Sequence, residues 1–333
     1  MPEPSRRSFL RLAAGAVGLP RPARSVVALT AGDDRRANVR RALEAIDDQI
    51  RPRLRGKKYV LLKPNCVAVN NQLGSPHADA LRGILDYLAP RFRGPVVIAD
   101  SSKDNTRDAY ENFHYDQVVA EYGRARIRLV DLNEETEQVA HQVVDRNLHL
   151  VNVRLAARLF DPDAFILGSA ILKAHDNVVA TLSVKNLVMS APLHSASKSE
   201  GDWHDKYVYH AGYRQIQMNL ALTARRMQPF WGATVIDGYE GMEGEGPLRG
   251  TPVPSRVAVA STDFVAADRV GVELMGIDPR WPGYLRYCAE ANLGEYDLDR
   301  IDLRAEAELN AVRKTYKLHP RINKQLEWMG PLG

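Results

Sequence analysis

Two lysines, a histidine, an aspartate and two asparagines lie close together in residues 173–186, which read KAHDNVVATLSVKN. They surround a short β-branched segment and follow an apolar run, residues 164–172, that is typical of a buried strand. Ionisable groups set into apolar sequence need partners or shifted pKa values, because burying an unpaired charge is costly. Such groups at strand ends are frequent at functional sites, so we expect chemistry here. The alternative is a loop in which one ion pair fixes the next strand.

The predicted catalytic residues are two lysines, a histidine and an aspartate, namely Lys173, His175, Lys185 and Asp237. The lysines would orient an anionic group of a substrate through charge-assisted hydrogen bonds. His175 would move a proton or hold a metal, since the usual pKa of histidine lies near neutrality. Asp237 would act as a base or bind a cation. A lone histidine is often only a hydrogen-bonding residue, and that alternative stays open for His175.

Short polar side chains also follow other apolar runs of the chain. Lys63 and Asn65 follow one such run, and Asp100 and Ser101 follow another. Ligands bind outside the carboxyl ends of the strands in an open parallel sheet, so we expect these groups to ring one crevice. In the competing interpretation each polar group caps its own helix or turn. The predicted substrate-binding residues are Lys63, Asn65, Ser101 and Asn186.

For Asp263 alone, the position before a helical pattern favours an N-cap over a role in a site.

Residues 238–250 form an acidic, glycine-rich segment that reads GYEGMEGEGPLRG. It lacks the lysine and the serine or threonine of a phosphate-binding loop, and its carboxylates would repel phosphate. Acidic glycine-rich segments suit hard cations, so Asp100 and Glu243 are candidate ligands for a divalent metal. The alternative for this segment is a solvated turn.

Residues 191–212 are a long polar stretch that contains His194, His204 and His210. Loops longer than about a dozen residues tend to be lids or disordered segments, so we expect a mobile lid over the site. The three histidines lack the spacing of a metal site, and we expect them to be solvated.

Apolar runs alternate with amphipathic segments along most of the chain. This alternation predicts an α/β fold with a mostly parallel sheet flanked by helices. The sheet could fall into two lobes, residues 26–150 and 151–333, with the site between them. Residues 133–158 are less regular and could hold strands or a linking hairpin. Helical spacing occurs in residues 37–50, 77–88, 115–122, 213–227, 263–275, 282–291 and 305–317.

Composition excludes several classes of protein. The 333 residues carry a formal charge of +4, which is too small to indicate a nucleic-acid-binding protein. The two cysteines, Cys66 and Cys288, form no CxxC motif. A disulfide framework, a structural zinc site and an iron–sulfur cluster held within this chain are therefore not expected.

Residues 5–11 read SRRSFLR, which resembles the twin-arginine export motif. The apolar segment that follows, residues 12–19, is too short for a stable membrane anchor. We expect residues 1–25 to be a signal peptide read by the twin-arginine export machinery, and residues 26–333 to be one α/β domain in the periplasm or another extracytoplasmic space. This route carries folded proteins and so suggests a cofactor inserted before export. The alternative is a basic amphipathic tail.

Several motifs occur in an order that resembles the family called domain of unknown function 362, over residues 26–294. They include KPN (63–65), DSS (100–102), KAH (173–175), LSVKNL (182–187), the glycine-rich segment and TD (262–263). Some members of that family carry a ferredoxin-like cluster domain, whose cysteines this chain lacks.

These features together predict an exported, metal- or cofactor-dependent enzyme that acts on a small anionic molecule by proton transfer or redox chemistry. The alternative is a non-catalytic protein that binds a ligand or cofactor, or that matures a partner.

Overall fold

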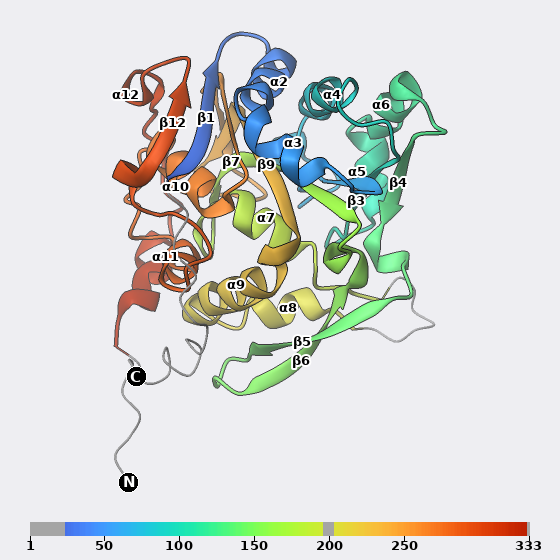
Figure 1. Cartoon of the computed structure of the whole chain (residues 1–333). Coiled ribbons are helices and arrows are strands. Elements are labelled where there is room, and N and C mark those ends of the chain that lie inside the picture. Colours follow the sequence, from blue (N-terminus) through green and yellow to red (C-terminus); the bar gives the residue numbers. More distant parts are fainter. Residues whose placement is uncertain (1–23, 196–202, 332–333) are drawn as a thin grey trace.

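A long mixed β-sheet runs through the whole molecule (Figure 1). The computed structural model describes residues 24–195 and 203–331. The order of strands across the sheet is β12 (Ile301–Ala305), β1 (Ser25–Ala31), β11 (Val257–Ser261), β9 (Trp231–Glu243), β7 (Ala164–His175), β2 (Tyr59–Lys63), β3 (Val96–Asp100) and β4 (Ile127–Asp131). Strands from both sides of residue 150 therefore pair in this one sheet.

Most neighbouring strands are parallel, and β11 is the exception because it runs antiparallel to both β1 and β9. Two short strands fold back onto the sheet as hairpins. These are β8 (Val179–Thr181), which pairs with the end of β7, and β10 (Thr251–Val253), which pairs with the end of β9. The predicted α/β class with a mostly parallel sheet is confirmed.

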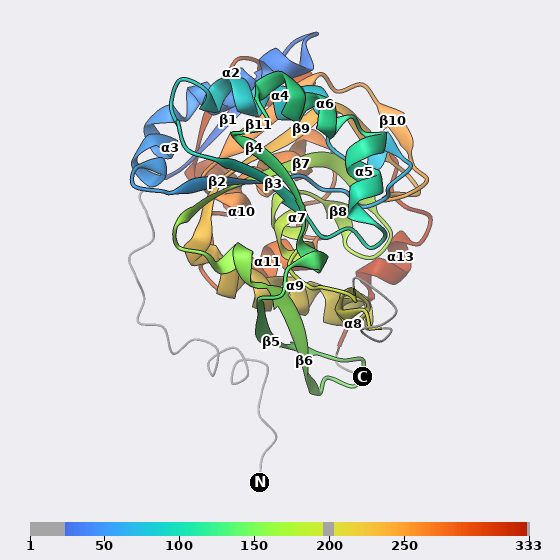
Figure 2. The ribbon, with the colours of Figure 1, turned by 90° about the vertical axis from the view of Figure 1, so that its right-hand side faces the viewer.

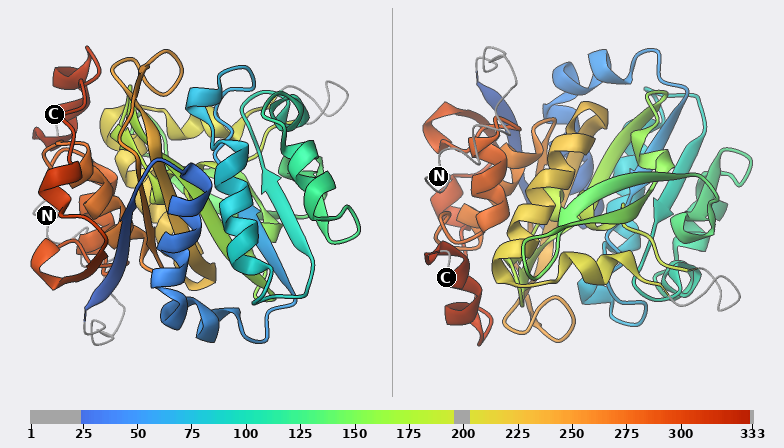
Figure 3. Two further views of the ribbon diagram at one scale, coloured as in Figure 1. Left: turned by 90° about the horizontal axis from the view of Figure 1, so that it is seen from above. Right: turned by 90° about the horizontal axis from the view of Figure 1, so that it is seen from below.

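Helices cover both faces of the sheet, as the two views of Figure 3 show. One face carries α2 (Arg35–Ala45), α3 (Asp47–Leu54), α4 (Ala78–Leu88), α5 (Thr106–Asn112) and α6 (Tyr115–Tyr122). The other carries α7 (Ser183–Met189), α8 (Asp205–Tyr209), α9 (Tyr213–Met227), α10 (Phe264–Leu274) and α11 (Gly283–Glu290). Each face has its own hydrophobic core, so the molecule has three layers.

The alternation of side chains along β2 shows how the strands supply both cores. Leu61 packs in the core beneath α7, whereas Val60 and Leu62 pack in the core beneath α4. Successive side chains of a strand point to opposite faces. Lys63, which follows Leu62, therefore points towards the α7 side, where it meets Asn186.

A two-stranded hairpin, β5 (Gln138–Val144) and β6 (Leu150–Ala156), lies apart from the main sheet in Figures 1 and 2. Asn219 of α9 holds it, because its side chain accepts from Val144 N at 2.8 Å and donates to Val144 O at 2.9 Å. The irregular stretch predicted as strands or a hairpin is thus a hairpin.

Two helix predictions differ from the structure. The helix expected over residues 37–50 is two helices, α2 and α3, separated at Ile46, whose backbone leaves the helical region. The helix expected over residues 305–317 is wrong, since only the four residues of α12 (Leu309–Val312) are helical there. Backbone bonds from Lys314 N to Leu274 O and from Tyr316 N to Met275 O hold this segment against the end of α10. The last helix is α13 (Ile322–Gln325).

Asp263 is the N-cap of α10, as predicted, since its carboxylate accepts from Val265 N and Ala266 N at 3.0 Å each.

Candidate functional site

Four buried lysines come together near the carboxyl ends of β2 and β7. Lys63 ends β2, Lys173 lies near the end of β7, Lys185 is on α7 and Lys206 is on α8. Their exposed fractions are 1%, 0%, 5% and 5% respectively. They are close enough for their charges to act on one another, because Lys185 and Lys63 lower the pKa of Lys173. We call Lys63, Lys173, Lys185 and Lys206 the lysine cluster.

Lys63 is held by an amide and a carboxylate. Its Nζ donates to Asn186 Oδ1 at 2.7 Å and lies 3.1 Å from Asp100 Oδ1, and it also donates to Pro64 O. Burial lowers the pKa of Lys63, although Asp100 opposes this shift. Desolvation therefore outweighs the attraction of the one carboxylate that contacts the cluster within the described residues.

Asp100 is fixed by two backbone amides as well as by the lysine. Its Oδ2 accepts from Cys66 N at 2.7 Å, and its Oδ1 accepts from Ser101 N at 2.7 Å. The residues that follow β2 and β3 are thus joined through this side chain. Burial raises the pKa of the Cys66 thiol well above its usual value, and Asp100 adds to that rise, so Cys66 stays a thiol.

Lys173 is completely buried, and its Nζ donates to Gly74 O at 2.8 Å. Gly74 belongs to the loop between β2 and α4. Burial lowers the pKa of Lys173 well below its usual value, and the charges of Lys185 and Lys63 lower it further. The charged form of Lys173 is therefore costly unless a bound anion compensates it.

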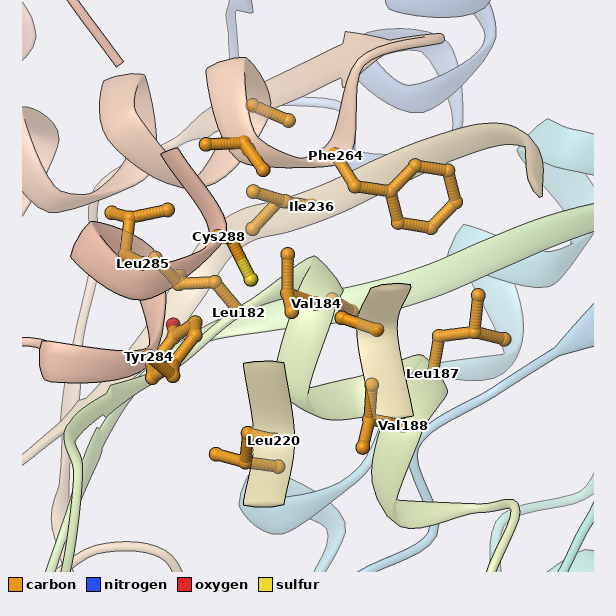
Figure 4. Close-up of a cluster of buried hydrophobic side chains, with 14 of the residues drawn as sticks. Leu182, Val184, Leu187, Val188, Leu220, Ile236, Phe264, Tyr284, Leu285 and Cys288 are labelled. Atoms are coloured by element: carbon orange, nitrogen blue, oxygen red, sulfur yellow. The ribbon is translucent and has the colours of Figure 1, made fainter. Parts of the chain in front are cut away.

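Lys185 is positioned by the packing of α7. Val184, Leu187 and Val188 of α7 point into the core, where Figure 4 shows them near Leu220 and Ile236. The carboxylate of Asp268 also holds the start of this helix.

Asp268 of α10 accepts from Ser183 N at 2.6 Å and from Val184 N at 3.0 Å. Within residues 24–195 and 203–331, the side-chain nitrogen of Lys185 makes no hydrogen bond or ion pair. Burial lowers the pKa of Lys185 to about 8.

Lys206 belongs to the cluster, although sequence reasoning did not select it. Its Nζ donates to Ser101 Oγ at 2.7 Å, to Met189 O at 2.6 Å and to Pro192 O at 2.7 Å. Burial lowers its pKa to about 7. Lys206 lies in the polar stretch 191–212 and follows no apolar run, so its sequence position does not mark it as a residue at a strand end. The apolar residues Val208 and Tyr209 that follow it were the available signal of burial, and Tyr209 is fully buried.

His175 ends β7 and is 3% exposed. Its Nδ1 lies 3.0 Å from Asn177 N and 3.1 Å from Asp176 Oδ1. Burial and the nearby charge of Lys185 lower its pKa well below the usual value, so the ring is neutral and Nδ1 accepts from Asn177 N–H. In the tautomer in which Nδ1 accepts from Asn177 N–H, the ring proton is on Nε2, which is then a hydrogen-bond donor.

His210 takes the opposite tautomer. Its Nδ1 lies 3.0 Å from Lys206 O, and a carbonyl only accepts, so Nδ1 carries the proton. His210 is exposed to solvent, yet partial desolvation of its ring, followed by the charge of Lys185, lowers its pKa. The ring is neutral, and Nε2 keeps a free lone pair for accepting a proton. The charge of Lys185 lowers the pKa of both His175 and His210, so both rings lie near the lysine cluster.

The expectation that the histidines of residues 191–212 are solvated is wrong for His194 and His204, whereas His210 is exposed. His194 is half-buried, with its Nε2 3.1 Å from Ser102 O and its Nδ1 2.9 Å from Ser195 O. Its ring stacks on that of His204, with the ring centres 4.8 Å apart. The described parts of this stretch also contain the helix α8, so it is not one long loop. Residues 196–202 lie outside the described residues, and the lid stays a prediction.

The predicted substrate-binding residues lie around the cluster. Asn186 contacts Lys63, and its Nδ2 donates to Ser169 O at 3.0 Å. Ser101 Oγ accepts from Lys206 and donates to Ser190 O at 2.7 Å. Asn65 is 6% exposed, and its Nδ2 is buried without a hydrogen-bond partner among the described residues. An unpaired buried donor is costly, so this amide is available to a ligand.

Asp237 does not join the cluster, since its carboxylate contacts Arg35 and not one of the four lysines. Its Oδ2 lies 3.2 Å from Arg35 Nε of α2, and its Oδ1 accepts from Tyr239 N at 3.0 Å. Burial raises the pKa of Asp237, and Arg35 opposes that rise. The carboxylate follows a strand-like run as expected, but β9 continues beyond it to Glu243, so it does not lie at a strand end.

The segment expected as a glycine-rich turn is partly strand. β9 runs through its first half and pairs with β10. Gly246 packs against β7, and a Cβ on it would lie 2.0 Å from Ala174 O, so only glycine fits there. Glu243 accepts from Lys317 N at 2.8 Å and lies 3.5 Å from Lys317 Nζ.

Asp100 and Glu243 are thus engaged by different lysines. Across residues 24–195 and 203–331, no three His, Cys, Asp or Glu side chains are grouped so as to hold a metal ion.

A surface hollow lined by Tyr59, Glu135 and Arg158 lies at the amino ends of the strands, on the opposite side of the sheet's length from the lysine cluster. Tyr59 begins β2, and Lys63 ends it. Its arginine is already paired: Arg158 binds Glu135, and the Tyr59 hydroxyl donates to Asp161 at 2.8 Å. The lysine cluster, in contrast, has more cationic groups than carboxylates. That imbalance makes it the candidate site for an anion.

No helix in the described part of the chain is long and apolar enough to cross a membrane.

Comparisons with known proteins support one family. The model of the family described as "Domain of unknown function (DUF362)" matches residues 60–273, which is more than half of the chain and lies inside the stretch expected from its motifs. A thylakoid-associated protein of Synechocystis sp. is 29% identical over 128 residues, which are 38% of this chain and 37% of that protein. A solved structure from Thermotoga maritima has a TM-score of 0.40 and 9% identity over 79% of this chain and 59% of the other. The chain thus spans 37% of the first protein and 59% of the second, less than two thirds of each.

Proposed function

Because the chain belongs to the family described as "Domain of unknown function (DUF362)", whose description names no reaction, we propose its function from the site: an enzyme that binds a small anionic molecule at the lysine cluster and moves a proton on it. The observation that carries this proposal is the burial of four lysines around a single contacting carboxylate. Part of this charge has no counterion within the described residues, and a bound anion would supply one.

The bonding within the cluster assigns a role to each group. Lys63 and Lys206 are anchored by several oxygen atoms, so they position neighbouring groups and attract the anion. The amide of Asn65 has a free donor for the same anion. His175 donates through Nε2, and His210 accepts through Nε2. A donor and an acceptor of this kind beside one anion are what proton transfer needs.

Two further proposals accompany this function. The first is export by the twin-arginine route, which rests on residues 5–11, outside the described residues. The second is a divalent cation held by Asp100 or Glu243, which metal analysis of protein purified after export would test. Proton transfer by the histidines and lysines is proposed independently of either.

Binding and exchange measurements test the main proposal. Small carboxylates and inorganic phosphate are titrated calorimetrically into the full chain and into Lys173→Met, with the exposed residue Lys314→Met as the matched control. We expect at least one anion to bind, and Lys173→Met to weaken binding by about tenfold or more, equal to about 1.4 kcal/mol. Failure of every anion to bind would overturn the proposal.

Solvent deuterium exchange then separates an enzyme from a carrier. In D2O, an enzyme of this kind exchanges a C–H next to the carboxylate of the bound molecule, which NMR detects as loss of the proton signal. The alternative is a protein that holds the anion for a partner, and it would give binding without exchange.

A further inference from the structure

Lys185 differs from the other lysines of the cluster in the bonding of its side-chain nitrogen. Lys173 Nζ donates to a backbone carbonyl, and Lys63 and Lys206 each donate to several oxygens. Lys185 Nζ has no such partner anywhere in the described residues. An amine that is tied to oxygens must break those bonds before it reacts, whereas the amine of Lys185 has no such bond to break among the residues that the structure describes.

The backbone that carries Lys185 is fixed on both sides of the helix. Val184, Leu187 and Val188 are buried in the hydrophobic core (Figure 4). Asp268 accepts from the first amides of α7. Lys185 also keeps 5% of its surface exposed, while Lys173 keeps none. The free amine is therefore on a rigid support.

The groups around Lys185 suit a ligand that has two functional groups, a carboxylate and a carbonyl. The neighbouring lysines, Lys63 and Lys173, favour a carboxylate. The Nε2–H of His175 is a donor that can hydrogen-bond to a carbonyl oxygen, and the Nε2 lone pair of His210 can take up a proton. A molecule with a carboxylate next to a carbonyl, a 2-oxo acid, uses all of these groups.

We propose that Lys185 is a nucleophilic amine that forms an imine with the carbonyl carbon of a small 2-oxo acid. The inference rests on the proposed anion site and names its substrate class. The Nζ lone pair forms a bond to the carbonyl carbon, and the C–O bond breaks. The oxygen leaves as water with the two protons that the amine loses, so no oxidant or reductant is needed.

Reductive trapping tests this step. The full chain is incubated with pyruvate or glyoxylate and treated with sodium borohydride, which converts an imine into a stable secondary amine. Peptide mass spectrometry then locates the adduct. We expect one adduct per chain on the peptide that contains Lys185. Because this assay maps the site in the unmutated protein, it does not depend on the folding of a variant.

Two control ligands separate the features of the substrate. Lactate has the carboxylate without the carbonyl, so it should compete with pyruvate and form no adduct. Acetone has the carbonyl without the carboxylate, so it should form far less adduct at the same concentration. Lys185→Arg keeps a cation but no primary amine, and it should lose the adduct, whereas Lys314→Ala should keep it.

The outcomes distinguish this inference from the proposed function. Binding of lactate and pyruvate with no adduct on Lys185 would overturn the imine and leave the anion site standing. An adduct spread over exposed lysines, or one located on Lys206, would also overturn it. If no small anion binds at all, both the site and the imine fail.

Discussion

The ammonium of Lys63 and the carboxylate of Asp100 lie 3.1 Å apart, with 1% and 4% of their side chains exposed. This buried pair joins the ends of the neighbouring strands β2 and β3. The same carboxylate accepts from the amides of Cys66 and Ser101, so it organises both loops that leave these strands. The pair is therefore structural and also sets the charge of the site.

Replacing Asp100 by alanine should destabilise the fold strongly. The change leaves Lys63 buried without its carboxylate and removes the acceptor for two backbone amides. The free energy of unfolding should fall by on the order of 3 kcal/mol, as measured by urea denaturation. The matched control is Asp163→Ala, which removes the partner of Lys58 on the surface and should change stability little. Equal effects of the two substitutions would contradict the buried pairing.

The stability of the protein should rise between about pH 7 and pH 8.5. Burial lowers the pKa of Lys206 to about 7 and that of Lys185 to about 8, while both remain near 10.4 in the unfolded chain. In this range the unfolded chain holds protons that the folded chain has released, so folding gains as pH rises. Each group adds up to about 1.4 kcal/mol per pH unit.

The other buried lysines, Lys63 and Lys173, act in the same direction, because burial lowers their pKa values as well. Burial raises the pKa of Asp268 to about 7, so its contribution changes mostly below the window, and the cysteine thiols of the unfolded chain begin to titrate near its upper end. The measurement is urea denaturation at both pH values. Lys206→Met should reduce the rise in stability, while Lys314→Met should not. A flat profile in the unmutated protein would show that these lysines are not desolvated.

Asp237→Ala should destabilise the protein without removing the anion site. Its partner is Arg35, which is 14% exposed, so the loss should be about 2 kcal/mol, smaller than for a fully buried pair. Anion affinity, measured by calorimetry, should stay the same because Asp237 contacts no lysine of the cluster. If Asp237→Ala weakened anion binding as much as Lys173→Met does, Asp237 would belong to the anion site after all.

Substituting both arginines of the export motif, Arg6→Lys with Arg7→Lys, should leave the protein in the cytoplasm. The expectation rests on the sequence SRRSFLR, because twin arginines are what this machinery reads. Fractionation of cells that make either form would measure it. Normal export of the double variant would remove the basis for a periplasmic location.

Much of the fold could be predicted from periodicity. The helices α6 and α9 begin and end at the predicted residues, and the apolar runs at 59–62 and 96–99 are strands. The antiparallel insertion of β11 could not be predicted, because the direction of a buried strand leaves no mark on its composition. The helix expected near residues 305–317 failed because backbone bonds to the end of α10 outweigh helix propensity.

Part of the site could be predicted from the polar residues that follow apolar runs. The carboxyl ends of the strands bring together four of these residues from separate segments of the chain, namely Lys63, Asp100, Lys173 and Lys185. Lys206 was missed because it reaches the cluster from a helix of the polar stretch, and no strand end marks it. Asp237 was wrongly included because β9 extends past it, and a strand's true end depends on pairing with β10, which composition does not reveal.

The position of β1 has a consequence for how the protein acquires its shape during synthesis. Its two neighbours in the sheet, β11 and β12, are made last, and Ser261 Oγ bonds to Val26 O across 235 residues of chain. While the ribosome is still translating, β1 has no partner and the outer edge of β9 is open. Such edges invite pairing with other chains. The sheet is therefore completed only after almost the entire polypeptide has been released, and closing so long a loop makes that last step slow.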